Sequence, residues 1–134
     1  MNYTEHRNRA LVAAARKYIA SCRLQGHTPT LTEVTEAVIN SPAPSFYIGF
    51  EALYKAVCGA MKNPVKSDAP LTRSQMRVLA VLARVSDLRS REKMSLTDAV
   101  TRVMAGQAPC FYISEISARR ILSRLIVQKR SYKL

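Results

Sequence analysis

The sequence of 134 residues is poor in the side chains that build catalytic and metal sites. It has two histidines, His6 and His27, and neither has a cysteine or an acid at the spacing of metal ligands. The three cysteines lie far apart and form no C-x-x-C pair, which argues against a zinc site or a disulfide framework. We therefore expect reduced thiols, no metal, no cofactor and no enzymatic activity.

Glycine and long apolar runs are also scarce. The four glycines are isolated, so the chain has no glycine-rich loop of the kind that holds a phosphate. The longest apolar runs, "ALVAAA" at 10–15 and "VLAVLA" at 78–83, are far too short to cross a bilayer. The N-terminal residues do not resemble a signal peptide. These features predict a cytoplasmic protein that does not bind a membrane.

Acidic residues are few for a chain with so many basic ones. Nine Asp and Glu residues face 21 Lys and Arg residues, which gives a net charge of +12. Such a charge attracts polyanions, of which nucleic acid is the commonest. The excess is uneven, because residues 1–63 carry +3 and residues 64–134 carry +9. The alternative is a soluble protein that is basic but has no polyanionic partner.

One hexapeptide occurs twice in the sequence with a single difference. The stretch "APSFYI" at 43–48 returns as "APCFYI" at 108–113, 65 positions later. Over residues 31–48 the same shift gives eight identical pairs among 18 positions, where unrelated segments would give roughly one. The sequence therefore predicts two diverged tandem repeats, at 1–62 and 71–134, joined by a connector at 63–70.

Apolar spacing, capping residues and prolines predict three helices in each repeat and no sheet. Capping boxes are expected at three helix starts, Thr30 with Glu33, Thr72 with Gln75, and Ser95 with Asp98. The predicted helices cover about 4–24, 31–40, 50–61, 72–90, 95–106 and 115–129. Because the helix at 72–90 is apolar on several sides, we expect the repeats to pack as one compact body with this helix near its centre.

The order of the helices resembles that of tri-helical helix-turn-helix domains, which place a last helix in the major groove of DNA. The resemblance lies in the element order, because the proline-aromatic connection is longer than the usual turn of three or four residues. It implies a small DNA-binding protein, acting as a transcriptional regulator or an architectural factor.

The last helix carries the residues expected to contact duplex DNA. Arginines suit guanine edges and phosphates, and serine and glutamine suit phosphates and adenine. The candidates in this helix and the following tail are Ser117, Arg119, Arg120, Ser123, Arg124, Gln128, Lys129, Arg130 and Lys133. Arg73 and Arg77, near the start of the middle helix, are expected to add backbone contacts. The alternative is a solvated arginine face without a ligand.

Two further interpretations stay open at this level. Tyr47 and Tyr112 follow the repeated phenylalanines and are candidates for stacking on unpaired bases, which would make the protein a binder of single-stranded DNA or RNA. The nearly neutral helix at 50–61, with Tyr54 and Met61, favours a protein-interaction module or a homodimer formed through the first repeat. Phe46 and Phe111 are expected in the core.

Overall fold

The computed structural model describes residues 2–64 and 69–131, with the side chains of the last helix described up to Arg124. These residues form six helices and no strand, so the prediction of an all-helical protein is confirmed. The helices are α1 (Tyr3–Leu24), α2 (Leu31–Ile39), α3 (Phe50–Lys62), α4 (Arg73–Glu92), α5 (Leu96–Met104) and α6 (Glu115–Ser131).

Local capping explains where the helices begin. The Thr72 side chain accepts a hydrogen bond from the backbone N–H of Gln75, and the Gln75 side chain accepts one from the Thr72 N–H, so this capping box is confirmed. Ser95 caps α5 through the Asp98 N–H, at 3.1 Å. Ser114 does the same for α6 through the Ser117 N–H, at 3.1 Å.

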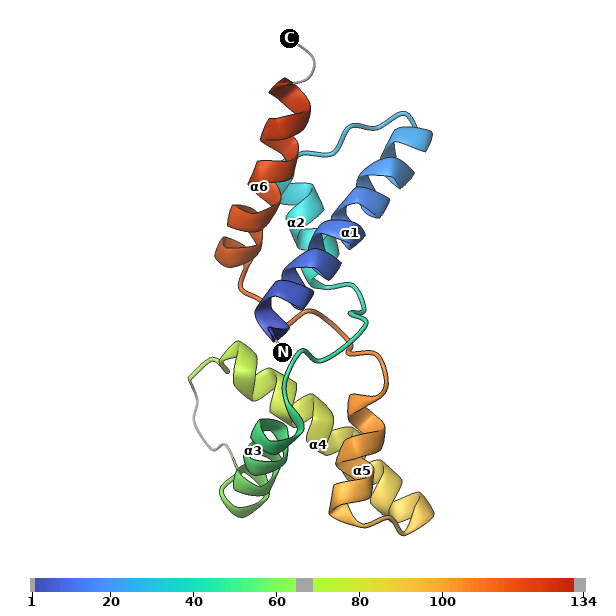
Figure 1. Ribbon diagram of the computed structural model, residues 1–134, viewed down its shortest axis with the longest axis vertical. Coiled ribbons are helices and arrows are strands. Elements are labelled where there is room, and N and C mark those ends of the chain that lie inside the picture. Colours follow the sequence, from blue (N-terminus) through green and yellow to red (C-terminus); the bar gives the residue numbers. More distant parts are fainter. Residues whose placement is uncertain (1, 65–68, 132–134) are drawn as a thin grey trace. The chain divides into compact units, whose positions relative to one another are not determined.

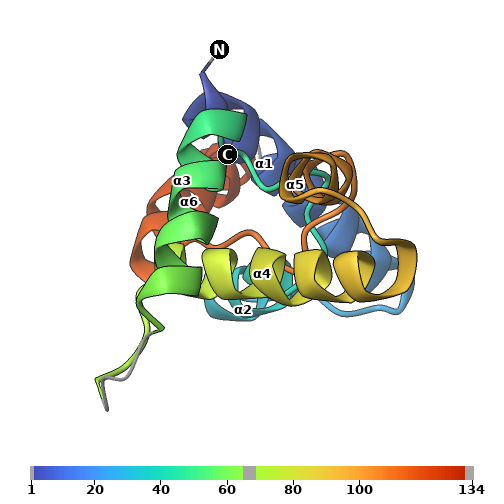
Figure 2. The same cartoon turned by 90° about the horizontal axis from the view of Figure 1, so that it is seen from below.

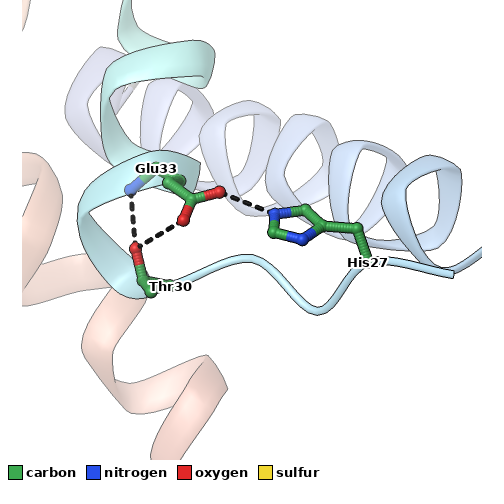
Figure 3. A network of polar contacts seen from close by, with 3 residues as sticks. All are labelled: His27, Thr30 and Glu33. Carbon is green, nitrogen blue, oxygen red and sulfur yellow. Dashed lines mark hydrogen bonds and ion pairs between the residues drawn. The ribbon is translucent and has the colours of Figure 1, made fainter. Parts of the chain in front are cut away.

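The cap of α2 is part of a small polar network. Thr30 accepts a hydrogen bond from the Glu33 N–H at 3.2 Å, as predicted. The Glu33 carboxylate, however, contacts the Thr30 hydroxyl and lies 2.8 Å from His27 Nε2 (Figure 3). This hydrogen bond with His27 is the main cause that lowers the pKa of Glu33 below its ordinary value. The network ties the turn after α1 to the start of α2.

The chain forms two compact units, of which the first is made of two segments that are far apart in the sequence. Unit 1 comprises residues 1–43 and 109–134, and unit 2 comprises residues 44–108. Unit 1 therefore contains α1, α2 and α6, and unit 2 contains α3, α4 and α5 (Figure 1). Each unit has the first two helices of one predicted repeat and the third helix of the other. The predicted repeats therefore do not coincide with the compact units, and the duplication that would have produced them stays a prediction.

In unit 1, α6 packs against both α1 and α2. The seam is made of small and branched apolar side chains that lose nearly all contact with solvent, which is the main stabilising contribution in a unit of this size. The buried residues of the three helices are Leu11, Ala15, Ile19, Cys22, Val34, Val38, Ala118 and Leu122. Thr35 is also buried, and its hydroxyl donates to the Leu31 carbonyl at 2.8 Å.

In unit 2, both α3 and α5 pack against α4, with α3 near its N-terminal end and α5 near its C-terminal end (Figure 2). The buried core residues on these helices are Leu53, Val57, Val81, Val85, Ala99, Val100 and Val103. An ion pair between Arg102 of α5 and Glu92 of α4, at 2.6 Å, adds a surface contact at that end of the unit.

The packing of the helices differs from the predicted helix-turn-helix-like arrangement. The sequence predicts that the second and third helices of each repeat pack together. In the structure, α2 packs with α6, the third helix of the other repeat, and α5 packs with α3. The connections at 40–49 and 105–114 each have ten residues outside helices and contain prolines. Such segments do not force the next helix back onto the previous one, as a turn of three or four residues does.

Helix α4 is less buried than its composition predicts. Only Val81 and Val85 are buried, whereas Leu79 and Leu82 keep part of their surface exposed. A helix that is apolar on several sides was expected near the centre of a single body. Within the described residues, α4 covers one core and leaves an apolar side incompletely covered.

The two proline-aromatic segments share several local features. Phe46 and Phe111 are each 3% exposed, which confirms that both belong to the core. Tyr47 and Tyr112 have φ values of 54° and 51°, in the left-handed region that non-glycine residues rarely adopt. A third residue pair, Ala43 and Ala108, is also buried. The same rare backbone conformation therefore recurs at equivalent positions of the two segments, 65 residues apart.

Other sequence expectations concern thiols and membranes. The three cysteines are free, with Cys22 buried and Cys58 and Cys110 half-buried. Among the described residues, no helix is long and apolar enough to cross a membrane. The same part of the chain has no group of three or more His, Cys, Asp or Glu side chains placed to hold a metal ion.

Candidate nucleic-acid interface

Helix α6 presents a buried side and a basic side. Ala118 and Leu122 are fully buried against α1 and α2. Arg120 lies two residues from each of them, and at 3.6 residues per turn it points away from the core. Arg124 follows one turn later on the same side, and both guanidinium groups are exposed. The core contact therefore fixes which face of α6 meets solvent.

The predicted serines of α6 differ in what their hydroxyl groups can do. Ser117 is exposed, and its hydroxyl accepts a hydrogen bond from the Ser114 hydroxyl at 2.9 Å, which leaves its own proton free to donate. Ser123 is half-buried, and its hydroxyl donates to the Arg120 carbonyl at 3.0 Å. Ser117 is thus better suited than Ser123 to donate to a phosphate.

Three arginines of α6 lack an acidic partner among the residues that the structure describes. Arg119, Arg120 and Arg124 make no ion pair with any other described residue, whereas elsewhere Arg91 pairs with Asp87 at 3.1 Å. Guanidinium groups without an intramolecular partner keep all their N–H donors available for an anion. Charge composition alone does not distinguish these residues from the paired arginines.

Four of the predicted contact residues lie where the structure gives no side-chain description. Gln128, Lys129 and Arg130 belong to α6, but their side chains are outside the described part of the chain. Lys133 lies outside the described residues altogether. Their contribution to a nucleic-acid contact stays a prediction.

Arg73 and Arg77 belong to unit 2, so the structure describes them separately from α6. Arg73 is exposed in the first turn of α4. Arg77 is half-buried, and its Nη1 donates to the Phe46 carbonyl at 3.4 Å. Arg84 likewise donates to the Gln107 carbonyl at 2.6 Å, and its guanidinium carbon lies 5.6 Å from the centre of the Phe46 ring. Arg77 and Arg84 therefore hold the proline-aromatic segment in unit 2.

The repeated tyrosines are half-buried. The Tyr47 N–H donates to Ser45 Oγ at 3.1 Å, which helps to hold its left-handed backbone. Burial raises the pKa of the Tyr47 phenol above its ordinary value. A ring that is partly covered offers less surface to a stacked base than an exposed one, and the role of Tyr47 and Tyr112 in stacking stays a prediction.

A second basic row, on α1, was missed by the sequence reasoning. Arg9, Arg16 and Arg23 are exposed and follow one another at intervals of seven residues, or about two turns, along the same side of α1. Arg9 pairs with Glu5 at 2.6 Å, whereas Arg16 and Arg23 have no ion pair within the described part of the chain. The seven-residue spacing was the available signal, and the low net charge of residues 1–63 concealed it.

The grouping of the helices also changes the distribution of charge. Unit 1 has eleven basic and four acidic residues and a net charge of +7, while unit 2 has ten and five and a net charge of +5. The contrast of +3 and +9 along the sequence is therefore not a contrast between the units. Unit 1 gains the basic α6 and joins it to the arginines of α1.

Comparison of the chain with protein-family models, with curated proteins and with solved structures finds no match. The residues of unit 1 themselves therefore indicate what it can bind. The arrangement in unit 1 is an exposed set of guanidinium groups, with a serine at the start of α6, on helices fixed by a common core.

Proposed function

We propose that this protein binds duplex DNA through unit 1, as a regulator or an architectural factor, with α6 as its main contact helix. The observation that carries the proposal is the set of exposed arginines on α6, Arg119, Arg120 and Arg124, which have no acidic partner among the described residues. They lie on a helix whose opposite side is fixed by Ala118 and Leu122.

The physical basis of the proposal is the match between these donors and the DNA backbone. A guanidinium group presents a planar fork of N–H donors that fits a phosphate or the edge of a guanine. Each phosphate that is neutralised releases a condensed counterion, so the affinity falls as salt rises. The row of Arg16 and Arg23 on α1 supplies further positive charge in the same unit.

The experiment is a fluorescence-anisotropy titration of labelled duplex DNA at several salt concentrations. We expect the logarithm of the association constant to fall steeply with the logarithm of the salt concentration. The double variant Arg120→Ala, Arg124→Ala is expected to lower the affinity and to reduce the salt slope by about two, because each phosphate contact contributes about one.

A matched variant separates a contact site from a general effect of charge. Arg89→Ala with Arg91→Ala also removes two exposed positive charges, but from α4 in unit 2. We expect this control to reduce the affinity much less than the α6 variant does. Equal losses in the two variants, or no binding to duplex DNA at low salt, would refute the proposed role of α6.

We also infer that the two repeats arose by duplication and act together in one folded chain. Helices α2 and α5 begin and end 65 residues apart, and so do the starts of α3 and α6. The shared left-handed φ of Tyr47 and Tyr112 supports the same inference. Unit 1, which we propose as the DNA-binding unit, combines α1 and α2 with α6 and not with α3, the next helix along the chain.

A protein-interaction module is the second candidate, and one feature of unit 2 favours it. A concave surface of about 640 Å³ lies between α3 and α4, and Met61 on its edge is 46% exposed. Its apolar lining is made of Ala60, Met61, Pro64, Ala69, Leu71, Leu79 and Leu82. Light scattering that shows a dimer insensitive to salt, together with no affinity for nucleic acid, would favour this function.

Competition of duplex DNA with single-stranded DNA for the protein tests the alternative that it binds single strands.

A further inference from the structure

The apolar surface on which α6 packs in unit 1 belongs to helices that are far from α6 in the sequence. Leu11 on α1 and Val34 and Val38 on α2 are buried, and the helix that packs on this pair starts at Glu115. Between α2 and α6 the chain passes through the whole of unit 2. Nothing in unit 1 therefore requires that α6 belong to the same molecule as α1 and α2.

The two third helices use equivalent positions to pack. The buried residues of α3 are Leu53 and Val57, and those of α6 with described side chains are Ala118 and Leu122. Each residue of the second pair follows its counterpart by 65 positions. Both helices thus present the same two positions, four residues apart, to the helix pair that receives them.

The segments that lead into the third helices are also alike. Segments 40–49 and 105–114 each have ten residues, a buried phenylalanine and a tyrosine with φ near 50°. A segment of ten residues spans at most about 33 Å when it is fully extended. Such a segment carries a helix away from the pair that precedes it, which is the geometry that allows a helix to be exchanged between molecules.

We propose that two copies of this chain associate by exchanging α6, so that α6 of one copy packs on α1 and α2 of the other. The contacts within unit 1 are the same in the exchanged dimer and in the monomer, so their free energies differ mainly through the entropy of association. Within one chain, the effective concentration of a tethered helix is on the order of millimolar. Exchange therefore becomes appreciable when chains fold together at high concentration.

The charge of the chain fixes how salt affects this dimer. Each copy carries +12, so two copies repel one another at low ionic strength. Added salt screens the repulsion and favours the dimer, whereas it weakens binding to DNA. The two processes consequently respond to salt in opposite directions, and this inference does not depend on the proposed function.

The test traps the contact between α2 and the segment before α6. The Phe111 N–H donates to the Ile39 carbonyl at 3.3 Å, so Asn40 and Cys110, the neighbours of these two residues, lie close together. Asn40 is exposed and Cys110 is half-buried. A copy with Asn40→Cys and Cys110→Ser is unfolded together with the natural chain, refolded at high concentration and treated with a short bismaleimide.

We expect a covalent dimer, because the thiol at position 40 of one copy meets Cys110 of the other only in the exchanged arrangement. A mixture of Cys110→Ser with the natural chain has the same remaining cysteines and gives the background. The single variant Asn40→Cys is expected to cross-link within the monomer, which checks that the two thiols are within reach.

Three results would overturn the proposal. One is a mixture that stays monomeric by light scattering after refolding at high concentration and high salt. Another is a dimer whose cross-linking does not exceed the background, since it would form through a different surface. The third is a failure of Asn40→Cys to cross-link within the monomer, because this contradicts the position of α6 on which the exchange depends.

Discussion

Replacing Leu122 with alanine should loosen helices that lie about a hundred residues earlier in the sequence. Leu122 is fully buried in the seam between α6 and the pair α1 and α2. Truncation of a buried leucine costs about 2–5 kcal/mol, because the transfer free energy of the lost methyl groups adds to that of the cavity. At 1.36 kcal/mol per factor of ten, the opening of unit 1 should become at least about 30-fold more frequent.

Hydrogen exchange followed by mass spectrometry of peptides measures where this loss of stability falls. We expect Leu122→Ala to speed amide exchange in α1, α2 and α6, with a smaller effect in α4 and α5. Leu53→Ala is the reciprocal variant, because Leu53 is fully buried in unit 2 although it belongs to the first predicted repeat. It should speed exchange in α3, α4 and α5.

The result that refutes this reasoning is the opposite pattern. If each third helix packed on the helices of its own repeat, Leu122→Ala would loosen α4 and α5, and Leu53→Ala would loosen α1 and α2. Leu122→Met keeps the volume of the side chain nearly constant and should cost less than about 1.5 kcal/mol, so it serves as the control for substitution at this position.

Two other predictions use the turn before α2 and the connector. The hydrogen bond with His27 lowers the pKa of Glu33, so its contribution to stability is present above the ordinary glutamate pKa and is lost as the pH falls through the lowered value. Chemical denaturation should therefore show that Glu33→Gln is less stable than the natural chain at neutral pH and that the difference vanishes in acid; a constant difference would contradict this. A protease site inserted within residues 63–70 should allow the folded chain to be cut without separating its halves on size exclusion, because each half supplies helices to both units. Separation of the halves without denaturant would contradict the packing of α6 on α1 and α2 and of α3 on α4 and α5.

The bounds of the helices could be predicted closely from local signals. The predicted starts at 31, 50 and 115 agree with Leu31, Phe50 and Glu115, because Thr30, Gly49 and Ser114 precede them as caps. Prolines in the segment after α2 prevent that helix from continuing. These features act over a few residues and do not depend on the rest of the fold.

The candidate site was only partly predictable. The exposed side of α6 followed from the apolar spacing of Ala118 and Leu122, which fixes the side that faces the core. The arginines of α1 did not enter the prediction, because their relevance depends on α6 lying in the same unit. The structural role of Arg77 was also hidden, since its contact with the Phe46 carbonyl joins residues 31 positions apart.

Local patterns in the amino-acid sequence predict six helices, their capped starts, the repeated proline-aromatic segment and a strong positive charge. The packing of the helices assigns each third helix to its unit, and thereby places the arginines of α1 and α6 in the same unit. Helices α3 and α6 bury apolar side chains at the same two positions, so the local sequence pattern does not indicate which pair of helices each of them packs on. The choice depends on how well each helix fills the apolar surface on which it packs and on the path of the two ten-residue segments, neither of which is encoded in local spacing.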